Sequence, residues 1–167
     1  VGLDVKLIPF NNSINTSEEV SSGRAMYGIG RSSLIIENKK NIVLLSAIFQ
    51  SSPYILLGTQ KSNIKTLKDF KDKTIMLTKD TKQMAAFMAM LKSSHIDLDQ
   101  LNIIETSFDI NDLIDAKTDL MAAYITNEPF VLKEKGIKPI IFDPKDYGYD
   151  LYSDILFTSK GEKTNNP

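Results

Sequence analysis

The stretch Leu120–Pro129, LMAAYITNEP, carries the pattern that decides the fold. Its first half is a short apolar run with the length and composition of a buried strand. Its second half ends in a hydroxyl, an amide, a carboxylate and a proline, and such residues are typical of a helix start. The stretch therefore predicts a core strand over 120–124 that leads directly into a helix over 128–135.

The same alternation between short apolar runs and helical spacing continues along the chain. Strands are expected over 2–10, 25–29, 42–49, 54–57, 74–77, 102–105, 140–142 and 155–158, helices over 16–23, 32–38, 82–93 and 111–116, and a polar linker over 160–167. In the clearest helix, Met84, Phe87, Met88 and Leu91 share one face, which we interpret as core. Strands that alternate with helices are typical of parallel sheets covered on both faces. The sequence therefore predicts an α/β fold.

Composition excludes several kinds of function. The 167 residues carry a formal net charge of -1, so the concentrated basic face that nucleic acid requires is not expected. The chain contains no cysteine and one histidine, His95, which leaves a metal site or a catalytic triad without partners. The longest apolar run, residues 42–49, is far shorter than the ~20 residues that cross a bilayer.

A weak internal repeat of the same order of elements indicates a binding site. Residues 20–30 and residues 113–124 both read as a helix end, a turn and a short strand. Polar residues then follow each strand, Arg31-Ser32-Ser33 in one half and Thr126-Asn127-Glu128 in the other. Open α/β sheets bind ligands just outside the carboxyl ends of their strands. We therefore expect two such edges to face one another across a cleft between two lobes.

Five segments occur here in the order in which one known family carries them. They are residues 28–33 (GIGRSS), 47–53 (AIFQSSP), 64–73 (IKTLKDFKDK), 123–129 (AYITNEP) and 143–148 (DPKDYG). On these segments the chain resembles the periplasmic-binding-like family of thiamine-pyrimidine synthases and binding proteins, from Gly2 to about Ser159. It is most similar to the branch that forms extracytoplasmic sensor domains of bacterial histidine kinases and diguanylate cyclases.

The resemblance implies a two-lobed, periplasmic binding protein-like fold (type 2, Venus flytrap) with mostly parallel sheets. We expect residues 1–58 and 148–167 to form the first lobe, residues 59–147 the second, and one ligand cleft to lie between them. Family members normally have one more strand and helix before the position of Val1 and further helices after that of Pro167. We expect these elements to be missing, and the chain to be a piece of a longer protein.

The candidate ligand-binding residues are Gly30, Arg31, Ser32, Ser33, Phe49, Gln50, Tyr124, Thr126, Asn127, Glu128 and Tyr147. An aromatic face beside an amide, as at Phe49 and Gln50, suits a flat heteroaromatic ligand, although Phe49 fits a core equally well. Ser32 either contacts the ligand or caps a helix. Glu128 has the right chemistry to accept N–H groups from an aminopyrimidine-like or cationic ligand, while helix capping explains the same residue types.

The resemblance implies an extracytoplasmic sensor domain of an inner-membrane signalling protein, a histidine kinase or diguanylate cyclase that is membrane-anchored and dimeric. Closure of the lobes around a pyrimidine-like or amine-containing ligand would carry the signal, without catalysis, cofactor or metal. The alternative is a substrate-binding protein of an ABC transporter for a thiamine-pyrimidine precursor or a similar small nitrogen compound. A pyrimidine-precursor synthase is the third reading, but the chain lacks the cysteine-rich motif of that branch.

Overall fold

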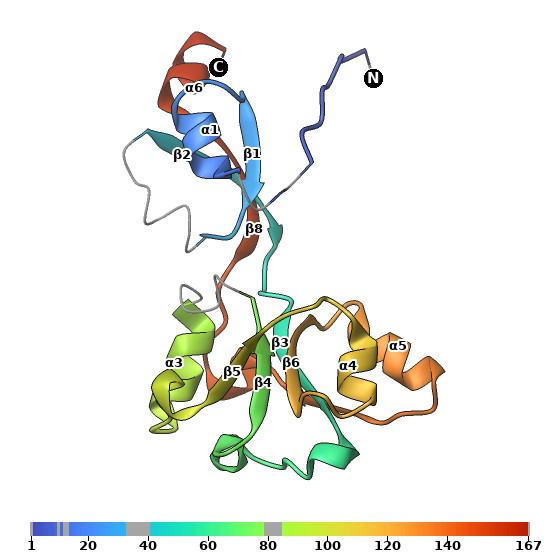
Figure 1. Cartoon of the computed structure of the whole chain (residues 1–167). Coiled ribbons are helices and arrows are strands. Elements are labelled where there is room, and N and C mark those ends of the chain that lie inside the picture. Colours follow the sequence, from blue (N-terminus) through green and yellow to red (C-terminus); the bar gives the residue numbers. More distant parts are fainter. Residues whose placement is uncertain (1, 10, 12–13, 33–40, 79–84, 167) are drawn as a thin grey trace. The chain divides into compact units, whose positions relative to one another are not determined.

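The computed structural model describes residues 2–9, 11, 14–32, 41–78 and 85–166 (Figure 1). The chain divides into two compact units: unit 1 comprises residues 1–48 and 154–167, and unit 2 comprises residues 49–153. Strands and helices occur in both units, which confirms the α/β class. Across the described residues, no helix combines the length and the apolar character needed to cross a membrane.

The unit boundaries differ from those expected from the sequence, which were 58 and 148. Strand β3 (Tyr54–Thr59) lies wholly in unit 2, because it pairs with β6 (Leu120–Tyr124) on one side and β7 (Pro139–Phe142) on the other. The chain therefore passes between units after residue 48 and again after residue 153. The expected ligand cleft between two lobes stays a prediction.

Unit 1 is built on a three-stranded sheet with the order β1-β8-β2. Its strands are β1 (Tyr27–Gly30), β8 (Ser153–Ser159) and β2 (Ile42–Phe49), and β1 pairs with β8 in antiparallel fashion. Helix α1 (Thr16–Ser21) contributes Val20 to a small core with Ile155 and Phe157. This core is much smaller than that of unit 2.

Gly28 lies where α1 packs against β1. A Cβ atom at this position would lie 2.7 Å from Phe157 Cζ, 2.9 Å from Thr16 Cγ2 and 3.0 Å from Val20 Cγ2. The absence of a side chain at Gly28 therefore permits the close packing of α1 against β1 and β8. We expect Gly28→Ala to lower the free energy of unfolding, measured by chemical denaturation, by about 1–3 kcal/mol because the core is overpacked.

A matched control is Gly161→Ala in helix α6 (Lys160–Asn165), where an added Cβ meets only Ser159 Oγ at 3.8 Å. Alanine is the better helix former, so this variant should be as stable as the wild type or more stable. Equal stabilities of the two variants would contradict the packing role of Gly28.

Unit 2 contains a five-stranded sheet with the order β5-β4-β6-β3-β7. Strand β4 (Thr74–Leu77) runs parallel to both β5 (Asn102–Glu105) and β6, while β3 runs antiparallel to β6 and β7. The sheet is therefore mixed, and β4, β5, β6 and β7 all share one direction. Their carboxyl ends meet at one edge of the sheet, together with the amino end of β3.

Helices cover both faces of this sheet (Figure 1). Helix α3 (Ala85–Ser93) packs Phe87, Met90 and Leu91 into one core cluster. Helices α4 (Ile110–Ile114) and α5 (Glu128–Glu134) contribute to a second cluster. All six residues of β3 are buried, as expected for a central strand with helices on both sides.

Short 3₁₀ helices complete unit 2 over Gln60–Ser62 (η1), Leu67–Phe70 (η2), Leu98–Gln100 (η4) and Pro144–Tyr147 (η5). Residues 66–69 form a capping box, in which the Asp69 carboxylate accepts the Thr66 backbone N–H at 2.8 Å. The side chain and the adjacent backbone thus fix the start of η2.

Two sequence expectations are wrong. Residues 2–9 form no strand, and Leu3 and Leu7 are 83% and 85% exposed. Alternation alone cannot supply the hydrogen-bonded neighbour that a strand needs, and no described strand pairs with this segment. The expected linker over 160–167 contains α6, whose first turn is capped by Ser159 Oγ accepting the Glu162 N–H at 3.0 Å. Of the expected helices over 32–38 and 82–93, residues 33–38 and 82–84 lie outside the described residues.

Candidate functional site

The carboxyl edge of the unit 2 sheet gathers polar groups from five strands. It consists of Thr78 after β4, Thr106–Asp109 after β5, Ile125–Glu128 after β6, Asp143 after β7 and Ser51–Pro53 before β3. Backbone hydrogen bonds link these segments: the Ile125 N–H donates to the Pro53 carbonyl at 2.8 Å, and the Thr106 N–H donates to the Leu77 carbonyl at 3.0 Å. We take this edge as the candidate site, because open α/β sheets bind ligands there.

Glu128 is the central acceptor of the carboxyl edge. It is the first residue of α5 and is partly buried. Its Oε2 accepts the Tyr124 backbone N–H at 2.8 Å, and its Oε1 accepts the Asn127 side-chain amide at 3.0 Å. Each carboxylate oxygen offers two lone pairs, so these contacts orient the group and leave acceptor capacity for a ligand.

The predicted helix start at this point is confirmed, but its capping differs in detail. Asn127 occupies the N-cap position and Pro129 follows in the first turn, yet the Asn127 side chain makes no capping hydrogen bond. It donates to Glu128 instead. Contact between Glu128 and a ligand stays a prediction.

Aromatic rings connect the carboxyl edge to the core. The ring of Tyr124 lies edge-on to that of Tyr54, with centroids 6.2 Å apart, and Tyr54 lies edge-on to Phe87 at 6.5 Å. The Tyr54 hydroxyl and Thr78 Oγ1 form a hydrogen bond of 3.3 Å. Tyr54 is 4% exposed and therefore lies in the core, and its contact with the Tyr124 ring fixes the position of Tyr124.

A polar cluster lies beside η5. The Ser51 hydroxyl donates to Asp150 at 2.9 Å, and Lys145 Nζ lies 3.4 Å from Ser51 Oγ and 3.7 Å from Asp150 Oδ2. Burial raises the pKa of Asp143 above its ordinary value, opposed by the Lys145 backbone N–H that donates to its carboxylate at 2.9 Å. Burial likewise raises the pKa of Tyr147, at the end of η5.

The structure places the sequence candidates in two sets. In unit 2, Tyr124, Thr126, Asn127 and Glu128 lie at the carboxyl edge, Phe49 and Gln50 lead into residues 51–53 of that edge, and Tyr147 ends η5. In unit 1, Gly30 ends β1, partly buried Arg31 and Ser32 follow it, and Ser33 lies outside the described residues. Sequence reasoning missed Tyr54 and Thr78, because nothing in their neighbourhood signals that β3 begins at this edge.

In unit 1, Arg31 lies near the carboxylate of Asp154. Gly30 pairs with Ile155 across the β1–β8 ladder, which brings the following Arg31 close to the preceding Asp154. Burial raises the pKa of Asp154 above its ordinary value, and the positive charge of Arg31 opposes this shift in part. Asp154 also has a positive φ of 49°, a conformation that asparagine adopts more readily than most residues.

We expect Asp154→Asn to raise the melting temperature at pH 7. A raised folded-state pKa means that the folded protein binds more protons, so its stability falls as pH rises from the ordinary carboxyl pKa through the raised one. Asparagine removes that loss, so the gain should shrink near pH 3.5, below the ordinary pKa of about 3.9. Thermal unfolding at both pH values, with the exposed Asp4→Asn as control, checks this. A gain that is independent of pH would exclude the titration of Asp154 as its cause.

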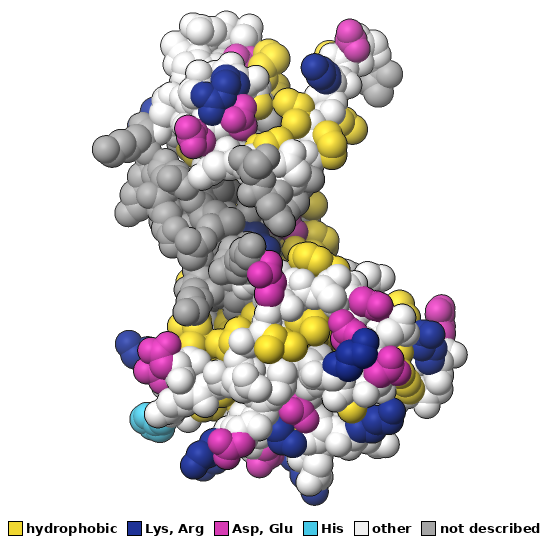
Figure 2. Space-filling model, in the orientation of Figure 1, with side chains coloured by type: hydrophobic (Ala, Val, Ile, Leu, Met, Phe, Trp, Pro, Cys, Tyr) yellow, Lys and Arg dark blue, Asp and Glu magenta, His cyan; other side chains and the backbone are white. Residues whose placement is uncertain are grey.

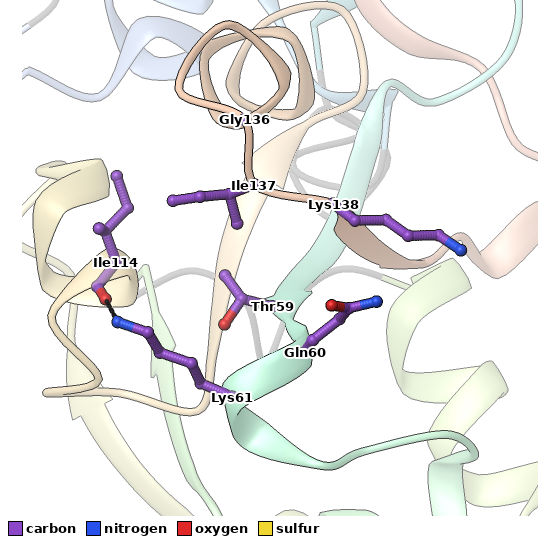
Figure 3. Close-up of a pocket in the computed structure, with 7 residues that line it drawn as sticks. All are labelled: Thr59, Gln60, Lys61, Ile114, Gly136, Ile137 and Lys138. Atoms are coloured by element: carbon purple, nitrogen blue, oxygen red, sulfur yellow. Dashed lines mark hydrogen bonds between the residues drawn. The ribbon is translucent and has the colours of Figure 1, made fainter.

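A small hollow lies at the opposite edge of the unit 2 sheet (Figure 3). Its volume is about 220 Å³, and it is lined by Thr59, Gln60, Lys61, Ile114, Gly136, Ile137 and Lys138. Lys61 Nζ already donates to the Ile114 carbonyl at 2.8 Å, and the Ile137 side chain points toward Ile114 (Figure 3). This hollow is smaller than usual ligand pockets and contains none of the sequence candidates.

The described residues contain no candidate metal centre. Within residues 2–9, 11, 14–32, 41–78 and 85–166, no three acidic or histidine side chains converge so as to hold a metal ion. His95 is exposed, and charged side chains of both signs are interspersed on the visible face of unit 2 (Figure 2).

Comparisons with known proteins agree with this architecture. Residues 1–167 match the family model described as NMT1/THI5 like. No curated protein shows significant sequence similarity to the chain. Among solved structures, the periplasmic sulfonate-binding protein SsuA from Methylobacillus flagellatus KT, assigned to a sulfonate ABC transporter, is similar with a TM-score of 0.71 and 19% identity. The match covers 90% of this chain and 47% of that one.

Two further structures are similar. The periplasmic aliphatic sulphonate-binding protein SsuA from Escherichia coli has a TM-score of 0.67 and 12% identity, over 89% of this chain and 52% of that chain. A substrate-binding protein of an ABC uptake transporter from Streptococcus pneumoniae, with bound histidine, has a TM-score of 0.59 and 14% identity, over 89% and 61%. The chain thus spans about half the length of the SsuA structures, and it has the periplasmic binding protein-like fold expected from its sequence.

Proposed function

This chain belongs to the NMT1/THI5-like family, and from that membership we propose that it binds a small molecule as the substrate-binding protein of an ABC uptake transporter. The proposal rests on one observation above all. Polar groups from five strands converge on the carboxyl edge of unit 2, where Glu128 is held ready to accept hydrogen bonds. The similar structures that bind sulfonate or histidine support this use of the fold.

The sequence led us to expect a sensor domain first and a transport protein second. The comparisons favour the reverse order, because the similar structures named above are transporter components. We accordingly place the chain outside the cytoplasm, without catalysis of its own. Deleting the gene should abolish uptake of the bound compound, whereas intact uptake with loss of a transcriptional or cyclic-dinucleotide response would favour the sensor.

We propose that the ligand is a small nitrogen compound, pyrimidine-like or amine-containing. Carboxylates dominate the described carboxyl edge and its flank, with Glu128, Asp143 and Asp150 against Lys145, which already contacts Ser51 and Asp150. N–H groups of a ligand would meet acceptors there, while the negative charge of a sulfonate would be repelled by the acids.

A thermal-shift screen tests the proposal, using 4-aminopyrimidine, putrescine, arginine and ethanesulfonate. A compound at 100 times its dissociation constant should stabilise the protein by about 2.7 kcal/mol. We expect stabilisation by the nitrogen compounds and none by ethanesulfonate. Stabilisation by ethanesulfonate alone would overturn the ligand class, and no stabilisation by any of the four would overturn the proposed function.

A further inference from the structure

Phe108 is the most exposed aromatic side chain among the described residues, with 81% of its surface accessible. It lies in the segment that follows β5 at the carboxyl edge. A single exposed apolar residue is ordinary on a protein surface. Its backbone is not ordinary, because φ is 60°, a left-handed conformation that aromatic residues seldom adopt.

Hydrogen bonds on both sides hold Phe108 in this conformation. Its own N–H donates to Thr106 Oγ1 at 3.0 Å, and the N–H of Asp109 donates to Ser107 Oγ at 3.1 Å. The Asp109 carboxylate in turn accepts the Asn111 N–H at 2.9 Å and caps α4. The segment is therefore fixed from the end of β5 to the start of α4, with the Phe108 ring exposed.

A second layer of contacts stabilises the same segment. The Ser107 hydroxyl donates to Asp112 at 2.6 Å, and Lys117 Nζ donates to the other oxygen of that carboxylate at 2.7 Å. These two hydrogen bonds hold the pKa of Asp112 below its ordinary value, and the one from Lys117 has the larger effect. The Ser107–Asp112–Lys117 network thus ties the loop to α4 and to the turn that follows α4.

Phe108 and Glu128 belong to the same edge of the sheet. Their strands, β5 and β6, flank β4 and run parallel to it. Neighbouring strands lie about 4.8 Å apart, so the ends of β5 and β6 are separated by roughly 10 Å, with Thr78 of β4 between them. A ligand that lies over the end of β4 can therefore approach both segments.

We propose that Phe108 is a specificity-determining contact of the ligand site, against which the ligand stacks a flat ring while its N–H groups reach Glu128. This inference rests on the proposed function and adds a selection to it: ring compounds are preferred over open-chain amines. The fixed loop supports that role, because a backbone segment held in place before binding loses little conformational freedom when the ligand arrives.

Affinity measurements on Phe108→Ala and Phe108→Tyr test the stacking contact, with 4-aminopyrimidine and putrescine as probes in calorimetric titrations. Phe108→Ala should weaken 4-aminopyrimidine binding about tenfold and leave putrescine binding unchanged, while Phe108→Tyr retains wild-type affinity for both. The melting temperature of Phe108→Ala should not fall, because an exposed ring contributes little to packing.

A fluorescence reporter gives an independent reading, since the chain contains no tryptophan. In Phe108→Trp, 4-aminopyrimidine should quench or shift the emission of the single indole, and putrescine should not. Phe130→Trp is the matched control: Phe130 is also exposed, at 56%, but its ring lies 5.3 Å from Lys133 Nζ along α5. Its emission should not respond.

The outcomes distinguish a failure of the Phe108 stacking contact from a failure of the proposed function. Wild-type binding of 4-aminopyrimidine with unchanged affinity in Phe108→Ala would overturn the stacking contact and leave the proposed function intact. Equal losses for 4-aminopyrimidine and putrescine would also overturn it, because a general disturbance does not distinguish a ring from an open chain. Failure of the wild type to bind either probe would overturn the proposed nitrogen ligand, and the Phe108 contact with it.

Discussion

Phe87→Ala is expected to lower the free energy of unfolding by about 3–5 kcal/mol, the usual cost of truncating a buried aromatic residue to alanine. Phe87 is completely buried on α3 and belongs to the larger core cluster. Its ring supports Tyr54, which in turn contacts Tyr124. Loss of the ring should therefore also loosen the candidate site. Urea denaturation of the wild type and the variant measures the change.

Phe130→Ala provides the matched control, because it removes the same side chain from an exposed position on α5. Its effect should stay within about 0.5 kcal/mol. Phe87→Leu, which retains most of the apolar volume, should be less destabilising than Phe87→Ala. A cost for Phe87→Ala no greater than that for Phe130→Ala would show that the aromatic contacts do not support unit 2.

Glu128→Ala is expected to weaken ligand binding by about 1.5–3 kcal/mol, the range for hydrogen bonds to a charged group. The carboxylate is already oriented by the Tyr124 N–H and the Asn127 amide, so a ligand meets a fixed acceptor. Calorimetric titration with the nitrogen compound that gives the largest thermal shift measures the loss. Glu134→Ala, at the exposed end of the same helix, should bind as the wild type does.

Glu128→Gln separates the structural role of this side chain from its role in binding. The amide oxygen still accepts the Tyr124 N–H, so the melting temperature should change little. The negative charge is lost, so affinity for a cationic ligand should still fall. Unchanged affinity in both Glu128 variants would remove this residue from the site.

Much of the fold follows from local pattern. The run over 120–124 and the helix start at residue 128 are confirmed, because an apolar run and a first-turn proline each specify their own backbone locally. The direction of a strand relative to its neighbours, by contrast, depends on residues that are distant in the sequence. The sequence does not reveal that β3 pairs with β6 and β7 in antiparallel fashion, and this pairing places β3 in unit 2, away from the boundary expected at residue 58.

The candidate site was predictable only where polar residues directly follow a recognised strand, as at Thr126–Glu128. Tyr54 is the first residue of its strand rather than a residue that follows one, and its partner Thr78 is brought to it only by the sheet order β4-β6-β3. Phe108 was missed because its exposure depends on a left-handed turn held by Thr106 and Ser107, which periodicity does not show. Contacts between distant segments therefore supply what the sequence alone lacked.

Amide chemical-shift mapping tests most directly whether a small molecule binds at the carboxyl edge of unit 2. The titrant is the compound that stabilises the protein most in the thermal-shift screen. The largest shifts are predicted at Thr78, Thr106–Asp109 and Ile125–Glu128, with little change at residues 59–61 and 136–138 of the opposite hollow. Shifts concentrated at the hollow, with the carboxyl edge unchanged, would contradict the proposed site.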